Sequence, residues 1–373
     1  MESIVIAGGG ISGLYLAYRL LRRGERRIHI YEATERLGGR IYERRFHDFN
    51  APMGGSMIRI SDSRVIRLCQ ELNLDLKRVD ATLMSEESAF VNDMIERILN
   101  AYEPSKYDRD VTVMDFLKRN FTEEEVTKYV NYSIYRDYTS GSIHEYIMDY
   151  PITDHLQVPV SSFVVKGGYS RLIDALVNSV KDRVTIHLNT PIRKVTDKFI
   201  ITANGSRKKY DRLFWTVTES NKQILLDSFP RMNILKTIMG VPFLKMYAYV
   251  ESTKDLPSIV VGGVLGKMFP LSKNILMVVY TDGQYADQLY SQIKDLDQDS
   301  TKTLIQGMVN QVGGFERVEL LDITYKYWST GIHQFASYPS NIRRRYDNVY
   351  LIGEAMSRNH GWAEGALESV EAI

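Results

Sequence analysis

Three glycines near the N-terminus have the spacing of a nucleotide-binding turn. Gly8, Gly10 and Gly13 follow an apolar segment at 3–7 and open a stretch with helical periodicity. Glycine lets the backbone approach a pyrophosphate, whose charge meets free N–H groups and the positive end of the helix dipole. Glu32 ends the next apolar segment, where a carboxylate accepts hydrogen bonds from a ribose diol and repels a 2′-phosphate. The pattern predicts a site for NAD or FAD and disfavours NADP.

A second group of residues suits a long cofactor with two phosphates. Arg36, Gly39 and Arg40 belong to an Arg-Leu-Gly-Gly-Arg element shortly after Glu32. Arginine can donate paired hydrogen bonds to phosphate oxygens. Together with the glycine turn and the acidic strand end, this element resembles the flavin-containing amine oxidase family, which includes monoamine, polyamine and L-amino-acid oxidases. The resemblance implies FAD as the cofactor.

The resemblance continues in the middle of the chain. Gly55, Ser56 and Met57 lie in a segment similar to the one that passes the flavin ring in the family, and residues 166–169 resemble its Gly-Gly element before a helix. Lys245 falls where the family has a lysine that holds a water against flavin N5. Lysine in an alternating strand is more often exposed to solvent, so that alternative stays open.

The C-terminal region resembles the flavin-binding signature of the family. Glu354 ends an apolar strand, where its carboxylate can accept hydrogen bonds from ribityl hydroxyls. A helix is expected to begin near Trp362 and Ala363, with its N-terminus facing flavin N1 and the C2 carbonyl, where reduced flavin carries negative charge. The alternative is a buried strand capped by an unrelated polar residue.

The resemblance also implies where a substrate would bind. Trp362 occupies the position of one aromatic wall around the substrate nitrogen. The segment 328–335 should supply the other wall, with His333 or Gln334 placed opposite Trp362 more readily than Phe335. That segment contains no cysteine, so FAD is expected to bind non-covalently. Arg59 lies near the place of an arginine that holds the substrate carboxylate in L-amino-acid oxidases, but a surface arginine fits the position equally well.

The elements that must position these residues alternate between strand and helix. The start of the chain reads as strand, helix, strand (residues 3–7, 14–21 and 27–33), which favours a parallel sheet. Helical periodicity dominates residues 61–160, and strand patterns return after 161, at 246–250, at 275–280 and at 348–352. We therefore expect an α/β fold in which a discontinuous Rossmann-type FAD-binding domain (1–60, 161–218 and 340–373) carries an α+β substrate or cap domain (61–160 and 219–339).

Composition narrows the class of protein. The 373 residues include 47 basic and 46 acidic side chains, so the net charge of +1 gives no electrostatic case for nucleic acid. The single cysteine, Cys69, excludes an internal disulfide. No apolar run of membrane-spanning length and no metal-binding pattern of histidines or cysteines is found, so we expect no membrane span and no metal. The chain opens directly into its first strand, so we expect no signal segment and a cytoplasmic location.

These observations lead to one expected function and two alternatives. The resemblance implies an FAD-dependent oxidase that acts on a carbon–nitrogen bond of an amine or amino acid, with O2 as acceptor and H2O2 as product. Lys245 and Trp362 would carry the catalytic roles, and no dedicated acid or base is evident. A related flavoenzyme acting on carbon–carbon bonds, such as a desaturase or a protoporphyrinogen oxidase-like protein, is one alternative; a catalytically silent interaction protein that keeps the fold is the other. The sequence leaves the substrate and the oligomeric state open.

Overall fold

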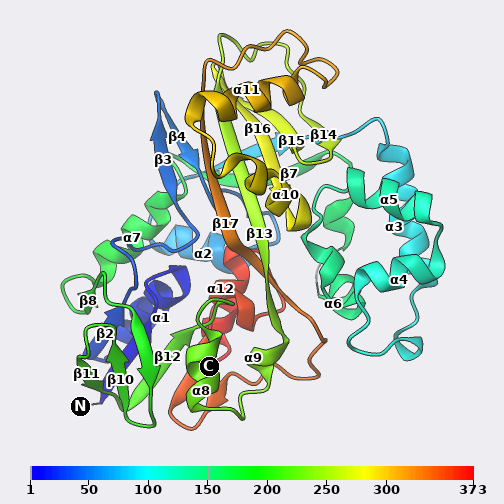
Figure 1. The fold of residues 1–373 in the computed structure, drawn as a ribbon. Helices are drawn as coiled ribbons and strands as arrows, with labels where there is room; N and C mark the ends of the chain where they lie inside the picture. The colour runs from blue at the N-terminus through cyan, green and yellow to red at the C-terminus, as the bar shows by residue number, and fades with distance from the viewer. Residues whose placement is uncertain (1, 150–151) are drawn as a thin grey trace.

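A parallel β-sheet forms the base of the molecule (Figure 1). The computed structural model describes residues 2–149 and 152–373. The strand order is β18-β19-β12-β1-β2-β8, and all neighbours pair in parallel except the edge strand β18. The strands are β1 (Ser3–Ala7), β2 (Arg27–Tyr31), β8 (Thr185–His187), β12 (Arg212–Thr216), β18 (Arg345–Tyr346) and β19 (Val349–Ile352). Strands that are distant in the sequence thus share one sheet, which confirms the expected α/β class with its Rossmann-type sheet.

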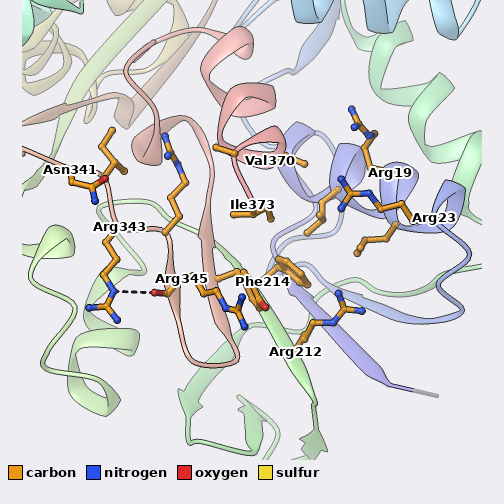
Figure 2. Close-up of a pocket in the computed structure, with 15 residues that line it drawn as sticks. Arg19, Arg23, Arg212, Phe214, Asn341, Arg343, Arg345, Val370 and Ile373 are labelled. Atoms are coloured by element: carbon orange, nitrogen blue, oxygen red, sulfur yellow. Dashed lines mark hydrogen bonds between the residues drawn. The ribbon is translucent and has the colours of Figure 1, made fainter.

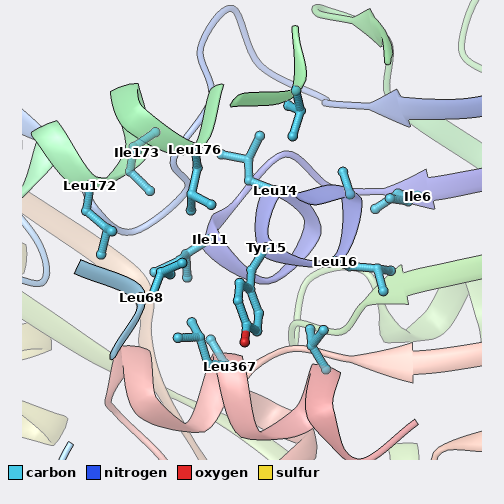
Figure 3. Packing of buried hydrophobic residues seen from close by; sticks show 14 of the residues in the cluster. Ile6, Ile11, Leu14, Tyr15, Leu16, Leu68, Leu172, Ile173, Leu176 and Leu367 are labelled. Atoms are coloured by element: carbon cyan, nitrogen blue, oxygen red, sulfur yellow. The ribbon is translucent and has the colours of Figure 1, made fainter. Parts of the chain in front are cut away.

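Helices from three distant parts of the chain cover one face of this sheet. α1 (Ile11–Arg22) lies between α7 (Ser170–Val180) and α12 (Ala363–Glu371), as Figure 3 shows, and α2 (Ser63–Glu71) packs nearby. Leu14 of α1, Leu176 of α7 and Leu367 of α12 are fully buried in this core. Burial of each such side chain contributes about 1.5–3 kcal/mol. This packing holds the two ends of the chain beside each other.

The other face of the parallel sheet is covered by smaller elements. A short antiparallel sheet has the order β11-β10-β9, and two helices follow it in the chain. Their side chains share a second core with Trp215 and Phe335. The elements are β9 (Ile192–Val195), β10 (Phe199–Thr202), β11 (Arg207–Lys209), α8 (Lys222–Ser228) and α9 (Ile234–Thr237).

An antiparallel sheet stands above the parallel one, and its long strands run down towards it (Figure 1). Its order is β14-β15-β16-β13-β17, and α10 and α11 pack against it around a core of their own. The elements are β13 (Ile238–Tyr249), β14 (Ile259–Gly262), β15 (Gly266–Ser272), β16 (Ile275–Asp282), β17 (Asp322–Phe335), α10 (Gly283–Ile293) and α11 (Gln298–Val309). The alternating segments 246–250 and 275–280 lie in this sheet, as expected.

A separate group of helices lies to the side of the antiparallel sheet (Figure 1). Thr122 caps the start of α5 through a reciprocal arrangement with Glu125, which satisfies free N–H groups of the first turn. The helices are α3 (Ser88–Ala101), α4 (Val113–Asn120), α5 (Glu123–Tyr132) and α6 (Ile143–Met148), with 3₁₀ turns η1 (Pro104–Lys106), η2 (Asp137–Ser140) and η3 (Ile152–His155). A further 3₁₀ turn, η4 (Glu354–Met356), follows β19 in the base.

Short strands connect the helical group to the base, and one of them differs from the prediction. The region 61–160 is expected to be helical, yet β6 (Leu76–Ala81) pairs with β7 (Val160–Val165), which also pairs with β5 (Ile58–Arg59). A hairpin of β3 (Glu43–Phe46) and β4 (Phe49–Pro52) lies before them. The pairing of β6 with β7 crosses the expected boundary at residue 160. The domain boundaries remain a prediction. Within the described residues, no helix is both long and apolar enough to cross a membrane.

Candidate functional site

One large cavity, of about 1810 Å³, lies where the carboxyl ends of the parallel strands meet the antiparallel sheet. This edge of an open α/β sheet is the usual place for a ligand. Most of the residues singled out from the sequence line it. They are Gly8, Gly10, Glu32, Arg36, Gly39, Arg40, Gly55, Ser56, Met57, Arg59, Lys245, Glu354, Trp362 and Ala363. The cavity therefore brings together residues from both ends and from the middle of the chain.

The glycine turn forms one end of this cavity. Gly8 has φ +108°, and a Cβ there would lie 1.9 Å from the Oγ1 atom of Thr216, so only glycine fits. Gly10 precedes α1 without a side-chain cap, and Ser12 in the first turn of α1 also lines the cavity. The free N–H groups of this helix end suit an anion. Gly13 does not line the cavity; a Cβ there would lie 2.1 Å from the Gly8 carbonyl oxygen, so this glycine allows close packing instead.

Glu32 lies beside this turn at the carboxyl end of β2 and is nearly buried. Its Oε2 accepts a hydrogen bond from the Gly9 N–H at 2.8 Å. Its Oε1 accepts bonds from the Thr34 N–H at 2.9 Å and the Thr34 hydroxyl at 2.7 Å. A carboxylate has about four lone-pair sites, so this fixed side chain retains acceptor capacity towards the cavity.

Arg36 and Arg40 hold the loop that crosses the cavity. The Arg36 guanidinium donates to the Gly39 carbonyl at 2.8 Å and stacks 4.3 Å from the ring centre of Tyr42. The Arg40 guanidinium donates to Glu354 Oε2 at 2.8 Å and to the Gly331 carbonyl at 2.8 Å. Both arginines line the cavity. Because their guanidinium groups are held by hydrogen bonds within the chain, they place positive charge beside the cavity at fixed positions.

Glu354 is the centre of a buried hydrogen-bond network. Besides Arg40, it accepts from the Gly361 N–H at 2.6 Å and from His333 through its N–H at 3.2 Å and its Nδ1 at 2.7 Å. Burial alone would raise the pKa of Glu354, but Arg40 and His333 outweigh it and hold that pKa well below its usual range. The Glu219 N–H donates to His333 Nε2 at 3.1 Å, so Nδ1 of a neutral imidazole carries the proton given to Glu354. This network fixes the backbone before Trp362.

Lys245 lies at the centre of β13 and is 2% exposed, so the solvent-facing alternative is wrong. Its Nζ donates to the Gly54 carbonyl at 2.7 Å and lies 5.1 Å from the ring centre of Tyr280. Burial lowers the pKa of Lys245 to about 7. Part of this amine is therefore neutral near pH 7, which suits a group that exchanges protons.

Trp362 precedes the first residue of α12, Ala363, and both line the cavity. The guanidinium of Arg59 lies 4.4 Å from the Trp362 ring centre and forms an ion pair with Asp62 at 2.8 Å. Arg59 is thus part of the cavity wall rather than a free surface arginine. The Arg59 guanidinium is already engaged by the Asp62 carboxylate and by the face of the Trp362 ring.

Comparison with known proteins identifies the family of this chain. A family model described as "Flavin containing amine oxidoreductase" matches residues 11–370. The chain belongs to this family. Its cofactor is a flavin, in agreement with the FAD expected from the sequence.

Relatives and solved structures place the chain within the family at some distance. "Protein anon-37Cs" of Drosophila simulans is 24% identical over 281 residues, which cover 64% of this chain and 53% of that protein. "Amine oxidase [flavin-containing] A" of Equus caballus is 38% identical over 81 residues, which cover 21% of this chain and 15% of that protein. The aligned parts thus span about half or less of these relatives. A putrescine oxidase double mutant has the same fold, with a TM-score of 0.75 at 15% identity and coverage of 100% of this chain and 97% of that one.

The second aromatic wall of this family member differs from the expectation. His333, Gln334 and Phe335 are buried and do not line the cavity. His333 bonds to Glu354, Gln334 Nε2 donates to Asp137 at 3.2 Å, and Phe335 packs in the second core. The end of β17 turns away from the cavity at these positions.

Other aromatic residues line the cavity around Lys245 instead. Phe243 and Tyr280 meet edge to face with ring centres 4.9 Å apart, and Trp328 Nε1 donates to the Met53 carbonyl at 2.8 Å. Sequence reasoning found the strand 275–280 but not the direction of Tyr280. Phe243 lies two residues before Lys245 on the same strand, and this period-2 spacing is the signal that could have found it.

Cys69 is fully buried in the core beneath α1 and does not line the cavity. Burial raises the pKa of its thiol to about 11, so the thiolate that covalent attachment would need is scarce. The sequence supplies no other cysteine. These facts agree with non-covalent FAD.

The arginine run at 343–345 lies outside the large cavity, beside a smaller one of about 530 Å³ (Figure 2). Several arginines here already bind other groups of the chain. Arg19 pairs with Glu371 at 3.2 Å, and Arg343 Nε donates to the Arg345 carbonyl at 3.1 Å. The run therefore has no direct part in the large cavity.

Proposed function

We propose that this protein is an FAD-dependent oxidase that converts an amine or amino acid to its imine, with O2 as electron acceptor. The carbon next to nitrogen gives up a hydride and the nitrogen loses a proton. Hydrolysis of the imine gives a carbonyl compound and ammonia or a smaller amine, while O2 takes up two electrons and two protons to form H2O2. The observation that carries the proposal is the single cavity that joins the Gly8 turn, Lys245 and Trp362.

The residues present fit FAD. The cavity volume exceeds the ~300–1,000 Å³ of ordinary small-molecule sites, so a dinucleotide and a substrate have room. The Gly8 turn and the free N-terminus of α1 suit the pyrophosphate, and Glu32 suits the adenosine ribose. The N-terminus of α12, at Ala363, suits the polar edge of the ring system. FAD, when bound, supplies the hydride acceptor.

The side chains near Lys245 suit a substrate that arrives as a neutral amine. Phe243, Tyr280, Trp328 and Trp362 present aromatic surface to the cavity. Such surface excludes water and gives a protonated amine few hydrogen-bond acceptors, which favours the uncharged form that can release hydride. The Lys245 amine, with its pKa lowered to about 7 by burial, would hold a water and exchange protons beside the reacting atoms.

Anaerobic mixing with a panel of amines and amino acids tests the proposal. At least one compound should bleach the flavin absorption near about 450 nm, and admission of O2 should restore it with one H2O2 per turnover. Lys273→Met changes an exposed lysine in the turn between β15 and β16 and should behave as the unchanged protein. Indifference to every amine and amino acid, or peroxide formation only with compounds that lack a carbon–nitrogen bond, would refute the proposal.

A further inference from the structure

A second buried lysine lies directly beside the aromatic part of the cavity. Lys267 on β15 is 3% exposed. Its Nζ lies 3.7 Å from the ring centre of Tyr280 and 3.9 Å from that of Tyr135. Both tyrosines line the cavity, whereas Lys267 does not. Lys267 therefore lies behind the cavity wall, and the rings of Tyr135 and Tyr280 separate its ammonium from the cavity.

Several buried charged or titratable groups lie close to Lys267, and the carboxylates of Asp282 and Asp137 attract its ammonium. Arg136, Asp137 and Asp282 are also buried, and none of them lines the cavity. The Arg136 N–H donates to Asp282 at 2.9 Å, and its guanidinium donates to the Gly263 carbonyl at 2.6 Å. No ion pair within 4 Å joins Lys267 to either aspartate among the described residues. The neighbouring His155 is kept neutral, since burial and Lys267 lower its pKa to about 3.

The ring of Tyr280 already has two lysine amines near it, and both are mostly protonated below about pH 7. Lys245 lies 5.1 Å from the ring centre, in addition to Lys267 at 3.7 Å. An aromatic face attracts a cation within about 6 Å, but a further cation here would also meet the repulsion of both lysines. At an effective dielectric constant near 20, unit charges several ångströms apart interact with about 2 kcal/mol.

The buried carboxylates that line the cavity are held by hydrogen bonds to other groups of the chain. Glu32 and Glu354 are engaged as described above, and Glu43 accepts bonds from the Tyr169 N–H at 2.6 Å and the Ser170 hydroxyl at 2.7 Å. Asp48 and Asp80 are exposed. Among the described lining residues, the buried carboxylate that keeps a free acceptor site is Glu32, which lies beside the glycine turn.

We propose that Lys267 is a specificity-determining residue: its buried ammonium behind Tyr135 and Tyr280 makes this wall of the cavity reject positive charge. The inference rests on the proposed function and deepens it. The substrate is an amine whose nitrogen reaches the wall uncharged and whose remaining body is neutral and apolar. Diamines and polyamines are disfavoured by the same charge.

A pair of probes of equal shape and different charge tests the proposal without turnover. Choline carries a quaternary ammonium, and 3,3-dimethylbutan-1-ol is its neutral isostere; neither has the C–N–H group that amine oxidation needs. Binding of each to the FAD-loaded protein is measured anaerobically by calorimetry at pH 6, where Lys267, with its pKa lowered to about 7 by burial, is mostly charged. Lys267→Met, Lys267→Arg and the exposed-lysine control Lys273→Met are compared with the unchanged protein.

The unchanged protein, Lys267→Arg and Lys273→Met should favour the neutral probe. In Lys267→Met the ratio of the two dissociation constants should shift towards choline by about tenfold. FAD content and thermal melting report whether this variant folds, and Lys267→Gln replaces it if it does not. Equal ratios in charged and uncharged variants, or no binding of either probe to any of them, would overturn the proposal. These binding ratios can be measured even if the protein does not oxidise amines, so failure of the proposed function and failure of this inference can be distinguished.

Discussion

Replacing Lys245 by methionine should make the protein more stable and nearly inactive at the same time. Methionine is unbranched and of similar length, so it can fill the same space without a charge. In the folded protein Lys245 is 2% exposed, and burial lowers its pKa from 10.5 to about 7. A catalytic residue held at a cost to stability would show this combination, whereas a structural lysine would lose stability on replacement.

The size of the effect follows from the pKa. A fall from 10.5 to about 7 corresponds to about 5 kcal/mol that favours the unfolded state. Loss of the hydrogen bond from Nζ to the Gly54 carbonyl returns about 1–2 kcal/mol. The free energy of unfolding should therefore rise by about 3 kcal/mol in Lys245→Met near neutral pH.

The pH dependence gives the sign of the effect. Between about pH 7 and 10.5 the unfolded chain binds a proton at Lys245 that the folded chain does not, so stability increases with pH there. The penalty is full below pH 7 and fades towards pH 10.5. The advantage of Lys245→Met should shrink in the same range, while Lys273→Met should show no such trend.

Denaturant unfolding at fixed FAD concentration, at pH 6.5 and pH 9.5, measures the stability difference. Single-turnover bleaching by the best amine measures activity, which should fall by about 100-fold or more. A variant that is less stable at pH 6.5, or whose stability advantage is the same at both pH values, would show that the charge at Lys245 does not carry the penalty assigned to it.

Three further substitutions probe the cavity from its two ends. Gly8→Ala places a Cβ 1.9 Å from a Thr216 atom at φ +108°, so FAD content after purification should fall about tenfold or more, whereas Gly205→Ala, in open space, should keep it. Glu354→Gln should lower the free energy of unfolding by about 2–3 kcal/mol at pH 7. Because the pKa of Glu354 is lowered in the folded protein, its carboxylate stabilises the fold above about pH 4.5, and the cost of the substitution should shrink below that pH. Urea titrations at pH 7 and pH 4 measure the difference. Trp362→Ala should raise KM for the best amine about tenfold with a smaller change in kcat, measured by peroxide release.

The sequence predicts the cofactor end of the site well because local rules dictate it. The strand, glycine turn and helix at residues 3–22 lie where periodicity placed them, and Glu32 ends β2 beside the turn. The strand at 349–352 and the helix at 363–371 also follow from local pattern. Packing of α1 against α12 then brings both signatures to one cavity.

The substrate end of the site depends on tertiary geometry that periodicity does not contain. His333 and Gln334 lie near the end of the long strand β17, and twist decides which side chains turn into the cavity. Their burial follows from partners far away in sequence, Glu354 and Asp137. The sequence around Lys267 is that of an ordinary strand lysine, and its burial depends on packing of the helical group against the sheet.

A crystal structure of the protein grown with FAD tests the central claim most directly. Continuous density should run through the one cavity, with the adenosine ribose beside Glu32, the pyrophosphate at the Gly8 turn and the ring system between Lys245 and Trp362. Density for FAD at any other place, or an empty cavity in crystals grown with saturating FAD, would contradict the account.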